Sequence, residues 1–318
     1  MSTDLYLGVD GGQSSTTALI GDVNGRVIGH GSGGPCNHVQ ASEGRPKFIG
    51  AMDACLRAAC YQAGLDPSAV RFRAACLGFS GGPSDKEDIL REILRTGRMF
   101  VTDDALIALS GATEGAPGII VIAGTGSIAF GRNAAGRTAR AGGWGYAFGD
   151  EGGGFDLTRQ ALRAALRFEE GWGPATALHR MLLDQTGARD ANDLLHRFYT
   201  EAYPRSQIAA LSKLVDQAAS EGDGIAIDLL ANAAAALVSI AEGVRQQLFP
   251  EIADHVAVAP VGGVFRSVRL LGEFRRALEA TGRVRVIAPA LGPAAGALIE
   301  AYRLAGLSVT LSGVPREK

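Results

Sequence analysis

The chain has 318 residues, which is more than one small hydrophobic core requires and suits two α/β domains. Hydrophobic residues make up 47% of it and charged residues 20%, a composition that excludes intrinsic disorder. The formal net charge of -2 gives no long-range attraction for a polyanion, so nucleic acid is not expected as a partner.

No apolar run in the sequence approaches the length of about 20 residues that crosses a bilayer. The first residues lack the basic start of a signal peptide, and a strand-like segment follows them directly. We therefore expect no membrane partner and a cytoplasmic location. Cys36, Cys55, Cys60 and Cys76 form no C-x-x-C pair and have no histidines at metal-ligand spacing, which predicts free thiols and no structural zinc.

Apolar runs separated by glycine turns predict that the chain opens with a strand, a glycine turn, a strand, a hairpin turn and a strand. Asn24-Gly25 is the pair that favours the hairpin. Helices and buried strands then alternate. The expected strands are 5–9, 16–20, 27–31, 72–78 and 100–102, and the expected helices are 42–63, a segment that begins at Ser84, and 105–112.

The same pattern restarts at residue 118, with an apolar strand, a Gly/Ser/Thr turn, a second strand and a hairpin turn at Ala135-Gly136. A duplicated structural unit is the hypothesis that this repetition suggests. We expect mostly helix over 155–248, then strand 256–261, helix 268–280, strand 284–287 and helix 294–304. The tail after Ala305 shows few packing signals and is expected to fray.

These elements predict an α/β protein with a first domain over 1–115 and a second over 116–292 that contains a helical insertion. The last helix, about 293–306, is expected to return to the first domain.

A glycine-rich turn follows the first strand directly and is the first candidate site. Backbone N–H groups in such a turn form an anion-binding concavity, and hydroxyl groups add donors. Asp10 at the strand end is a candidate ligand for a hydrated Mg²⁺. A plain hairpin with polar turn residues is the alternative. The candidate phosphate-binding residues are Gly11, Gly12, Gln13, Ser14, Ser15 and Thr16.

A second turn repeats this arrangement at Gly124, Thr125, Gly126 and Ser127. Two phosphate-binding turns on facing domains can grip one nucleotide, so the pair is a stronger signal than either turn alone.

Asp103 and Asp104 lie between a strand end and a helix start. One of them is readily explained as the helix N-cap. The other is a candidate general base that takes a proton from an acceptor hydroxyl during phosphoryl transfer. Capping alone is the alternative.

Two further glycine-rich segments are candidates for ligand binding. Gly142-Gly143-Trp144-Gly145 leads to Asp150, and an apolar ring together with carboxylates suits a sugar, although a turn with helix-capping acids is the alternative. Gly262 and Gly263 lie between a strand and a helix, where paired glycines allow a flat ring or a ribose to approach the backbone. A tight turn between the strand and the helix is the alternative.

Together these segments resemble the BadF/BadG/BcrA/BcrD-type ATPase family, and within it the N-acetylglucosamine kinase branch. The resemblance covers nearly the whole chain. It is carried, in order, by Gly8-Val9-Asp10-Gly11-Gly12-Gln13-Ser14, Asn37-His38, Asp104-Ala105, Gly124-Thr125-Gly126-Ser127, Gly143-Trp144-Gly145 with Gly149-Asp150-Glu151-Gly152, and Gly262-Gly263-Val264.

The resemblance implies a two-domain ribonuclease H-like, actin-type fold, with ATP and an amino sugar in the interdomain cleft and often a homodimer. It implies that Asp10 is linked to the metal and that Asp104 is the catalytic base. It further implies that Gly262 and Gly263 lie at the adenosine. The implied sugar-binding residues are Asn37, Thr125, Gly143, Trp144, Gly145 and Asp150.

The expected activity is transfer of the γ-phosphate of ATP to a hydroxyl, foremost O6, of N-acetylglucosamine or glucosamine. Muramic-acid-type acceptors and the O1 position stay open, as does a share of the base role for Asp103. The competing function is an ATPase that activates a dehydratase through a cysteine-bound iron–sulfur cluster. A transcriptional sugar sensor is a third possibility, for which we see no DNA-binding segment before Leu5.

Overall fold

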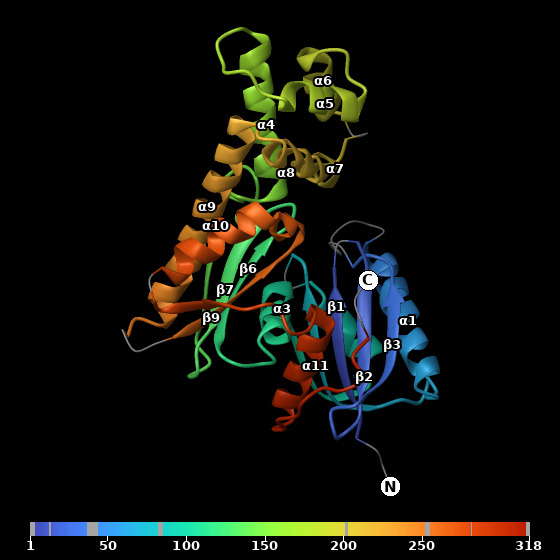
Figure 1. Cartoon of the computed structure of the whole chain (residues 1–318). Helices are drawn as coiled ribbons and strands as arrows, with labels where there is room; N and C mark the ends of the chain where they lie inside the picture. Colours follow the sequence, from blue (N-terminus) through green and yellow to red (C-terminus); the bar gives the residue numbers. More distant parts are fainter. Residues whose placement is uncertain are drawn as a thin grey trace. The chain divides into compact units, whose positions relative to one another are not determined.

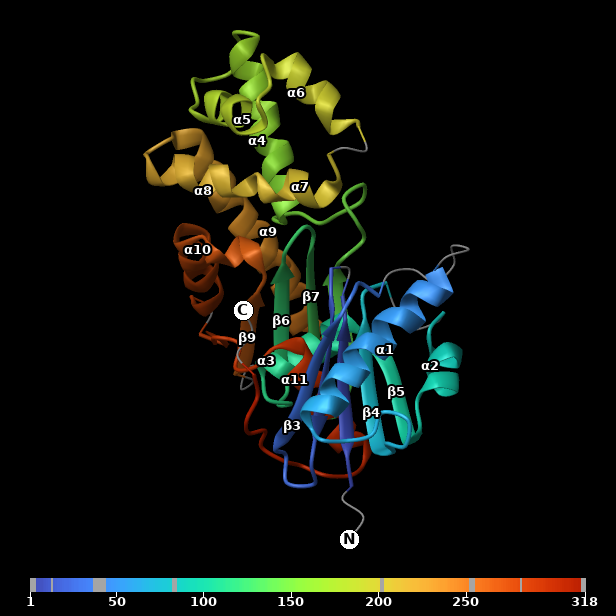
Figure 2. The ribbon, with the colours of Figure 1, turned by 90° about the vertical axis from the view of Figure 1, so that its right-hand side faces the viewer.

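The computed structural model describes residues 4–12, 14–36, 44–81, 85–200, 203–251, 255–280 and 282–315. The chain divides into two compact units (Figures 1 and 2). The first unit combines Met1–Pro117 with Ala288–Lys318, and the second consists of Gly118–Ile287.

The first unit is a five-stranded mixed sheet in the order β3-β2-β1-β4-β5. The central strand β1 pairs antiparallel with β2 and parallel with β4. Its strands are β1 (Tyr6–Gly11), β2 (Thr16–Gly21), β3 (Val27–Gly33), β4 (Phe72–Phe79) and β5 (Thr96–Asp103). Its helices are α1 (Gly44–Gln62), α2 (Glu87–Ile93), α3 (Asp104–Ala112) and α11 (Pro293–Leu304).

Helices cover both faces of this sheet because β1 is apolar on both sides. Leu7 and Val9 belong to the core that includes Phe48 of α1. The alternate residue Tyr6 points to the other face, where it joins Leu298 of α11. This is the two-residue alternation of a strand, here with both faces buried, as is usual for a sheet flanked by helices.

The second unit repeats this topology, with strands in the order β10-β9-β6-β7-β8. Again the central strand pairs antiparallel with the next strand in sequence and parallel with a later one. The strands are β6 (Gly118–Ala123), β7 (Ser127–Arg132), β8 (Thr138–Gly142), β9 (Val256–Val261) and β10 (Val284–Val286). The repeated topology supports the hypothesis of a duplicated unit and confirms the predicted α/β fold class.

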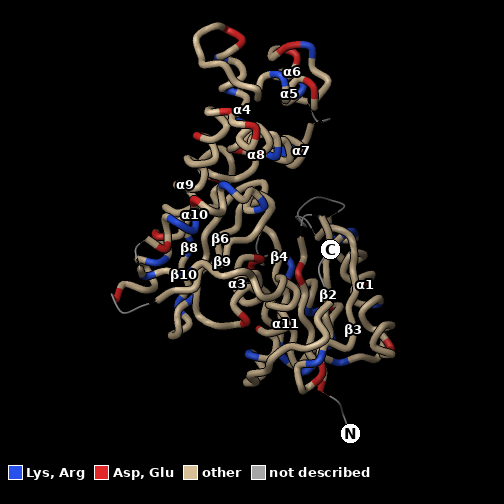
Figure 3. The backbone as a smooth tube through the Cα atoms, in the orientation of Figure 1, with Lys and Arg blue, Asp and Glu red and all other residues tan. Residues whose placement is uncertain are grey.

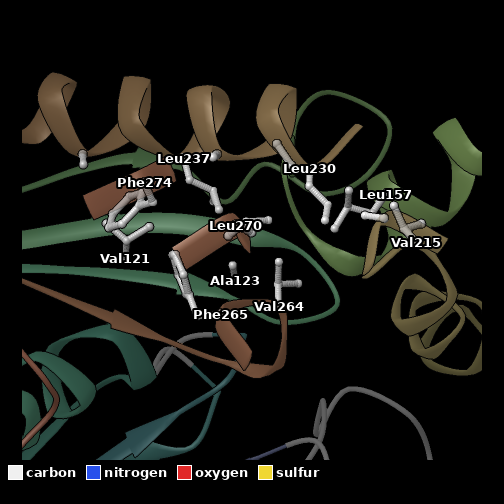
Figure 4. Packing of buried hydrophobic residues seen from close by; sticks show 14 of the residues in the cluster. Val121, Ala123, Leu157, Val215, Leu230, Leu237, Val264, Phe265, Leu270 and Phe274 are labelled. Carbon is white, nitrogen blue, oxygen red and sulfur yellow. The ribbon is translucent and has the colours of Figure 1, made fainter. Parts of the chain in front are cut away.

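Helices make up most of the segment between β8 and β9, as predicted. The helices of this unit are α4 (Gly154–Glu169), α5 (Leu178–Thr186), α6 (Ala191–Phe198), α7 (Arg205–Ala210), α8 (Ser212–Ser220), α9 (Gly224–Leu248), η1 (Gly263–Arg266) and α10 (Val268–Glu279). Figure 4 shows how the core of the sheet is closed: Val121 and Ala123 of β6 lie among Leu237 of α9, Phe274 of α10 and Phe265 of η1.

Helix α9 has 25 residues and is long and apolar enough, by length and composition, to cross a membrane. The sequence analysis did not identify this helix as an apolar segment of membrane-spanning length. In the structure α9 packs against β6, β7, β8, α8 and α10, and its Leu230, Leu237 and Val244 are buried there. These contacts are those of a helix in a protein core, which accounts for its apolar composition.

The expectation that the tail would fray is wrong. The amide of Ser312 donates to the Gly25 carbonyl at 3.0 Å, and the Ser312 carbonyl accepts from Val27 at 2.9 Å. Leu307, Val309 and Leu311 pack against the core beside α11. Their spacing of two residues was the missed signal, because alternate apolar residues indicate an extended segment with one buried side.

Helix α2 also differs from its prediction, since it begins at Glu87 with Lys86 as its N-cap and no capping side chain. Ser84, the expected cap, lies outside the described residues.

Asp223 ties the start of α9 to the start of α5 and generates a testable pH dependence. Its carboxylate caps α9 by accepting from Ala226 at 2.9 Å, and it also accepts from Ala177 at 2.6 Å and from the Thr176 hydroxyl at 2.8 Å. Burial alone would raise the pKa of Asp223, but these hydrogen bonds outweigh burial and lower it.

Because its folded pKa is depressed, Asp223 contributes stability at neutral pH that is lost as the pH falls through that pKa. Asp223→Asn should lower the free energy of unfolding by about 1–2 kcal/mol at pH 7, with the difference shrinking below about pH 4. Denaturant unfolding at several pH values measures this. Asp190→Asn, which replaces an N-cap that accepts a single bond from Asp193, is the matched control. A deficit that stays constant with pH would contradict the prediction.

Candidate active site

The predicted residues of the first unit that the structure describes lie at one edge of its sheet. Parallel pairing aligns Gly11 of β1 with Phe79 of β4, and Phe79 with Asp103 of β5. The carboxyl ends of these three strands therefore lie side by side. In open α/β sheets this edge is where ligands bind.

The turn between β1 and β2 leaves backbone amides available. The Gly12 amide donates to the Ser15 carbonyl at 2.9 Å, which closes the turn. Within the described part of the chain, the amides of Ser14 and Ser15 donate to no protein acceptor, and both residues are exposed. Two adjacent unpaired N–H groups are the donors that a phosphate needs. Gln13 lies outside the described residues.

Thr16 differs in character from the serines before it. It is fully buried, and its hydroxyl donates to the Gly34 carbonyl at 2.7 Å and lies within hydrogen-bond distance of Cys36 Sγ at 2.9 Å. The Cys36 amide in turn donates to the Gly12 carbonyl at 3.1 Å. Through these contacts the Thr16 side chain anchors the β1–β2 turn to the segment after β3.

The two adjacent aspartates have separate roles in the structure. Asp103 is the N-cap of α3, and its Oδ1 accepts from the Leu106 amide at 2.9 Å. Asp104 is the first residue of that helix, and its Oδ2 accepts from the Ser80 hydroxyl at 2.6 Å. The Ser80 amide donates to the Gly11 carbonyl at 3.2 Å, so Ser80 links Asp104 to the β1–β2 turn.

Ser80 was not among the predicted residues. A signal for it was present, because Ser80 follows the buried strand β4 directly, just as Asp103 is the last residue of β5 and Asp10 the next-to-last residue of β1.

In the second unit the turn between β6 and β7 repeats the first. The Gly124 amide donates to the Gly126 carbonyl at 3.0 Å. Among the residues that the structure describes, the amides of Thr125 and Gly126 have no acceptor. The turn carbonyls are occupied, since Gly124 accepts from Gly154 at 2.8 Å and Thr125 accepts from Phe155 at 3.0 Å. The first turn of α4 thus holds this loop in place.

The Asp150 segment packs directly on that turn. A Cβ atom added at Gly126 would overlap the Asp150 carboxylate, and one added at Gly153 would lie 2.7 Å from the Gly126 carbonyl carbon. Asp150 itself is buried and has a φ of 65°, an uncommon backbone conformation for a residue with a side chain. Ser127 completes the contact, because its hydroxyl donates to the Glu151 carbonyl at 2.7 Å.

The glycines before Asp150 form a surface loop that displays aromatic rings. Gly142, Gly143 and Gly145 all have positive φ, which explains the glycines. Trp144 is 65% exposed, and the guanidinium of Arg140 lies 4.4 Å from its ring centre. An exposed indole on a glycine loop can contact the apolar face of a sugar ring.

Gly262 and Gly263 differ from each other. Gly262 has a φ of 109°, and a Cβ there would overlap the carbonyl of Ala123 at the end of β6, so the backbone alone requires glycine. Gly263 is exposed, and a Cβ there would meet no atom within 4 Å. Of these two glycines, only Gly263 therefore has open space beside its Cα atom that no other part of the chain fills.

Asp10 has the chemistry expected of a magnesium ligand. It is a half-buried carboxylate at the end of β1, next to the amides of the β1–β2 turn. Mg²⁺ is usually held by one or two carboxylates with waters and substrate phosphates, so a single carboxylate fits. The described residues contain no group of three or more His, Cys, Asp or Glu that could hold a metal. Asn37, the remaining predicted sugar-binding residue, lies outside them.

Two sheets of one topology, each with a glycine turn after its first strand, define the actin-like class of ATPase folds. The chain belongs to the BadF/BadG/BcrA/BcrD ATPase family, whose profile matches residues 7–301. This confirms the family predicted from the sequence.

Among its relatives, the chain is 33% identical over 300 residues to the N-acetylmuramic acid/N-acetylglucosamine kinase of Clostridium acetobutylicum, covering 92% of this chain and 96% of that one. It is 28% identical over 317 residues to the N-acetyl-D-glucosamine kinase of Dictyostelium discoideum, with coverages of 94% and 98%. A solved structure from Chromobacterium violaceum, provisionally named N-acetylglucosamine kinase, matches with a TM-score of 0.73 and 29% identity over 94% of this chain and 99% of that one.

The contact between Gly126 and Asp150 generates a prediction about stability. Gly126→Ala should displace the Asp150 carboxylate and lower the free energy of unfolding by about 1–3 kcal/mol through overpacking. Gly124→Ala is the control in the same turn, because a Cβ there meets no atom within 4 Å. Its stability should change by less than about 0.5 kcal/mol. Equal effects of the two substitutions in denaturant unfolding would contradict the packing that we describe.

Proposed function

We propose that the chain is an ATP-dependent sugar kinase that transfers the γ-phosphate of ATP to the O6 hydroxyl of an amino sugar such as N-acetylglucosamine or glucosamine. The observation that carries this proposal is the pair of matching turns whose amides, at Ser14-Ser15 and Thr125-Gly126, have no acceptor among the described residues. The names of the Clostridium and Dictyostelium relatives supply the acceptor class.

The unpaired amides bind the phosphates of ATP. Backbone N–H groups fixed by the fold stabilise phosphoryl charge without reorganising, which is the main contribution of a protein to phosphoryl transfer. Gly263, with open space beside it, allows the adenosine to approach the backbone. Asp10 would hold Mg²⁺, which would supply charge neutralisation at the phosphates.

Asp104 is the general base. As the O6 hydroxyl attacks the γ-phosphorus, its proton moves to the Asp104 carboxylate and ADP leaves. The hydrogen bond from Ser80 to Oδ2 fixes the carboxylate and leaves Oδ1 for the acceptor hydroxyl. Asp103 is occupied as the cap of α3, which favours Asp104 over Asp103 for this role.

The sugar is held from the second unit. Thr125 and Asp150 bind ring hydroxyls, and the loop of Gly143, Trp144 and Gly145 provides an apolar surface for the ring. Asn37 is proposed to bind the same sugar. The family resemblance further supports a homodimer in the cytoplasm.

The competing function, activation of a dehydratase, requires cysteine thiolates that hold an iron–sulfur cluster. All four cysteines are buried free thiols. Burial raises the pKa of Cys55 to about 12, so its thiolate is strongly disfavoured. The cysteines of this chain therefore favour the kinase.

The acceptor can be identified by an ADP-release assay. With Mg·ATP, we expect strong stimulation by N-acetylglucosamine or glucosamine in a panel that also holds N-acetylmannosamine, N-acetylmuramic acid and glucose. ATP hydrolysis that no sugar changes would overturn the kinase function and favour the activator ATPase.

The base assignment has a matched pair of variants. Asp104→Asn should lower kcat by about 10²–10⁴-fold, because asparagine cannot accept the proton. Asp103→Asn should stay within about threefold of the wild type, because asparagine caps a helix as well as aspartate does. Circular dichroism checks that both variants are folded. Near-normal kcat in Asp104→Asn, or a large loss in Asp103→Asn alone, would show that Asp104 is not the base.

A further inference from the structure

The helical insertion of the second unit contains a small groove between α4 and α9, which pack against each other. Its volume is about 200 Å³. Pockets for drug-sized ligands span roughly 300–1,000 Å³, so this groove suits a molecule the size of a single sugar and is too small for a nucleotide. Its central residue Arg163 follows the start of α4 at Gly154 by about 13 Å along the helix axis, so the groove is separate from the β6–β7 turn.

Two arginines form one wall of this groove. Arg163 and Arg167 are four residues apart on α4, so their side chains lie on the same face of the helix, and both are exposed. Within the described chain neither has a carboxylate partner. Arg163 Nη1 makes a long hydrogen bond of 3.5 Å to Gln160 Oε1, and the guanidinium of Arg167 lies 4.9 Å from the ring centre of Trp172. Guanidinium groups in this state are the preferred partners of a phosphate.

The opposite wall has a different chemical character. Asp228 of α9 places an exposed carboxylate there that accepts no hydrogen bond from the residues that the structure describes. Ile225 and Leu229 of the same helix are half-buried and, with Pro174, supply an apolar surface. Basic and acidic residues are interspersed along the trace as a whole, so this local combination of two cations, one carboxylate and an apolar wall sets the groove apart (Figure 3).

The rim of the groove is held in a fixed conformation. Trp172 is 65% exposed, yet its indole Nε1 donates to Glu170 at 2.6 Å and its amide donates to the Arg167 carbonyl at 3.1 Å. A Cβ atom added at Gly173 would lie 2.6 Å from Arg167 Cβ, so the loop packs directly on the end of α4. A ligand that enters an ordered groove loses less free energy to the ordering of side chains and loops.

We propose that this groove is a second, non-catalytic site for the phosphate ester of an amino sugar with a free amino group. The phosphate pairs with Arg163 and Arg167, and the protonated amine pairs with Asp228. The C–H face of the sugar ring lies on Ile225 and Leu229. The ligand is the product class of the proposed kinase reaction, and in that respect the inference rests on the proposed function. Binding at the groove itself requires no phosphoryl transfer.

The test is calorimetry on the full chain without ATP, with saturating N-acetylglucosamine present to occupy the proposed acceptor site. Glucosamine 6-phosphate is compared with glucose 6-phosphate, which lacks the amine, and with inorganic phosphate. We expect one site per chain and tightest binding of glucosamine 6-phosphate. Arg163→Gln should weaken binding of all three by about 5–20-fold, because each loses a charge-assisted hydrogen bond to its phosphate.

Asp228→Asn should change the ligands in opposite directions. It should weaken binding of glucosamine 6-phosphate by about 3–10-fold, because the amine loses its ion pair, and strengthen binding of inorganic phosphate by about twofold, because a like charge is removed. Arg180→Gln is the matched control, since Arg180 is an exposed arginine of α5 that pairs with Asp184 outside the groove. It should change each affinity by less than about twofold. The initial kinase rate of Arg163→Gln without sugar phosphate should stay within about twofold of the wild type.

The outcomes separate this inference from the function on which it rests. Absence of binding, or binding that Arg163→Gln leaves unchanged, would overturn the inference and leave the kinase proposal intact. A preference for glucosamine 6-phosphate over glucose 6-phosphate that persists in Asp228→Asn would also overturn it. Binding that depends on both residues in a protein that phosphorylates no sugar would support the groove and overturn the proposed function.

Discussion

In the second unit, the conformation of the β6–β7 turn depends on the contact between the Asp150 carboxylate and Gly126. The carboxylate lies where any side chain at Gly126 would be, and α4 begins directly after this segment and donates its first amides to the carbonyls of the turn. Among the described residues, the amides of Thr125 and Gly126 therefore have no acceptor, while the carbonyls of the turn are satisfied. Adjacent N–H groups without acceptors favour the binding of an anion, which supports the phosphate-binding role proposed for this turn.

The first unit reaches the same result with different side chains. There the turn is anchored by the buried hydroxyl of Thr16 and by the amides of Cys36 and Ser80, and in the described part of the turn the N–H groups of Ser14 and Ser15 have no acceptor. One topology thus provides two turns for which we propose phosphate binding. The proposed proton acceptor Asp104 belongs to the first unit, and the proposed sugar-binding carboxylate Asp150 belongs to the second.

Most secondary structure could be predicted because buried strands and amphipathic helices leave clear periodic patterns. The tail was mispredicted because its apolar residues alternate over a short stretch that only packing beside α11 makes meaningful. Ser80 and Arg163 were missed for different reasons. Ser80 had a signal, its place at the end of a buried strand. Arg163 had only its four-residue spacing from Arg167, which indicates a ligand site only when α9 packs beside it.

The sequence by itself determined the family, the α/β class, the two glycine turns and the pair of candidate aspartates, because each depends on residues that are close together in the chain. The tertiary structure decided which residues do which task. Asp103 caps helix α3, whereas Asp104 accepts a hydrogen bond from Ser80. At position 262 the nearby Ala123 carbonyl leaves no room for a side chain, so glycine is required there, whereas position 263 has no such restriction. Such distinctions arise from contacts between segments far apart in sequence, which local patterns do not record.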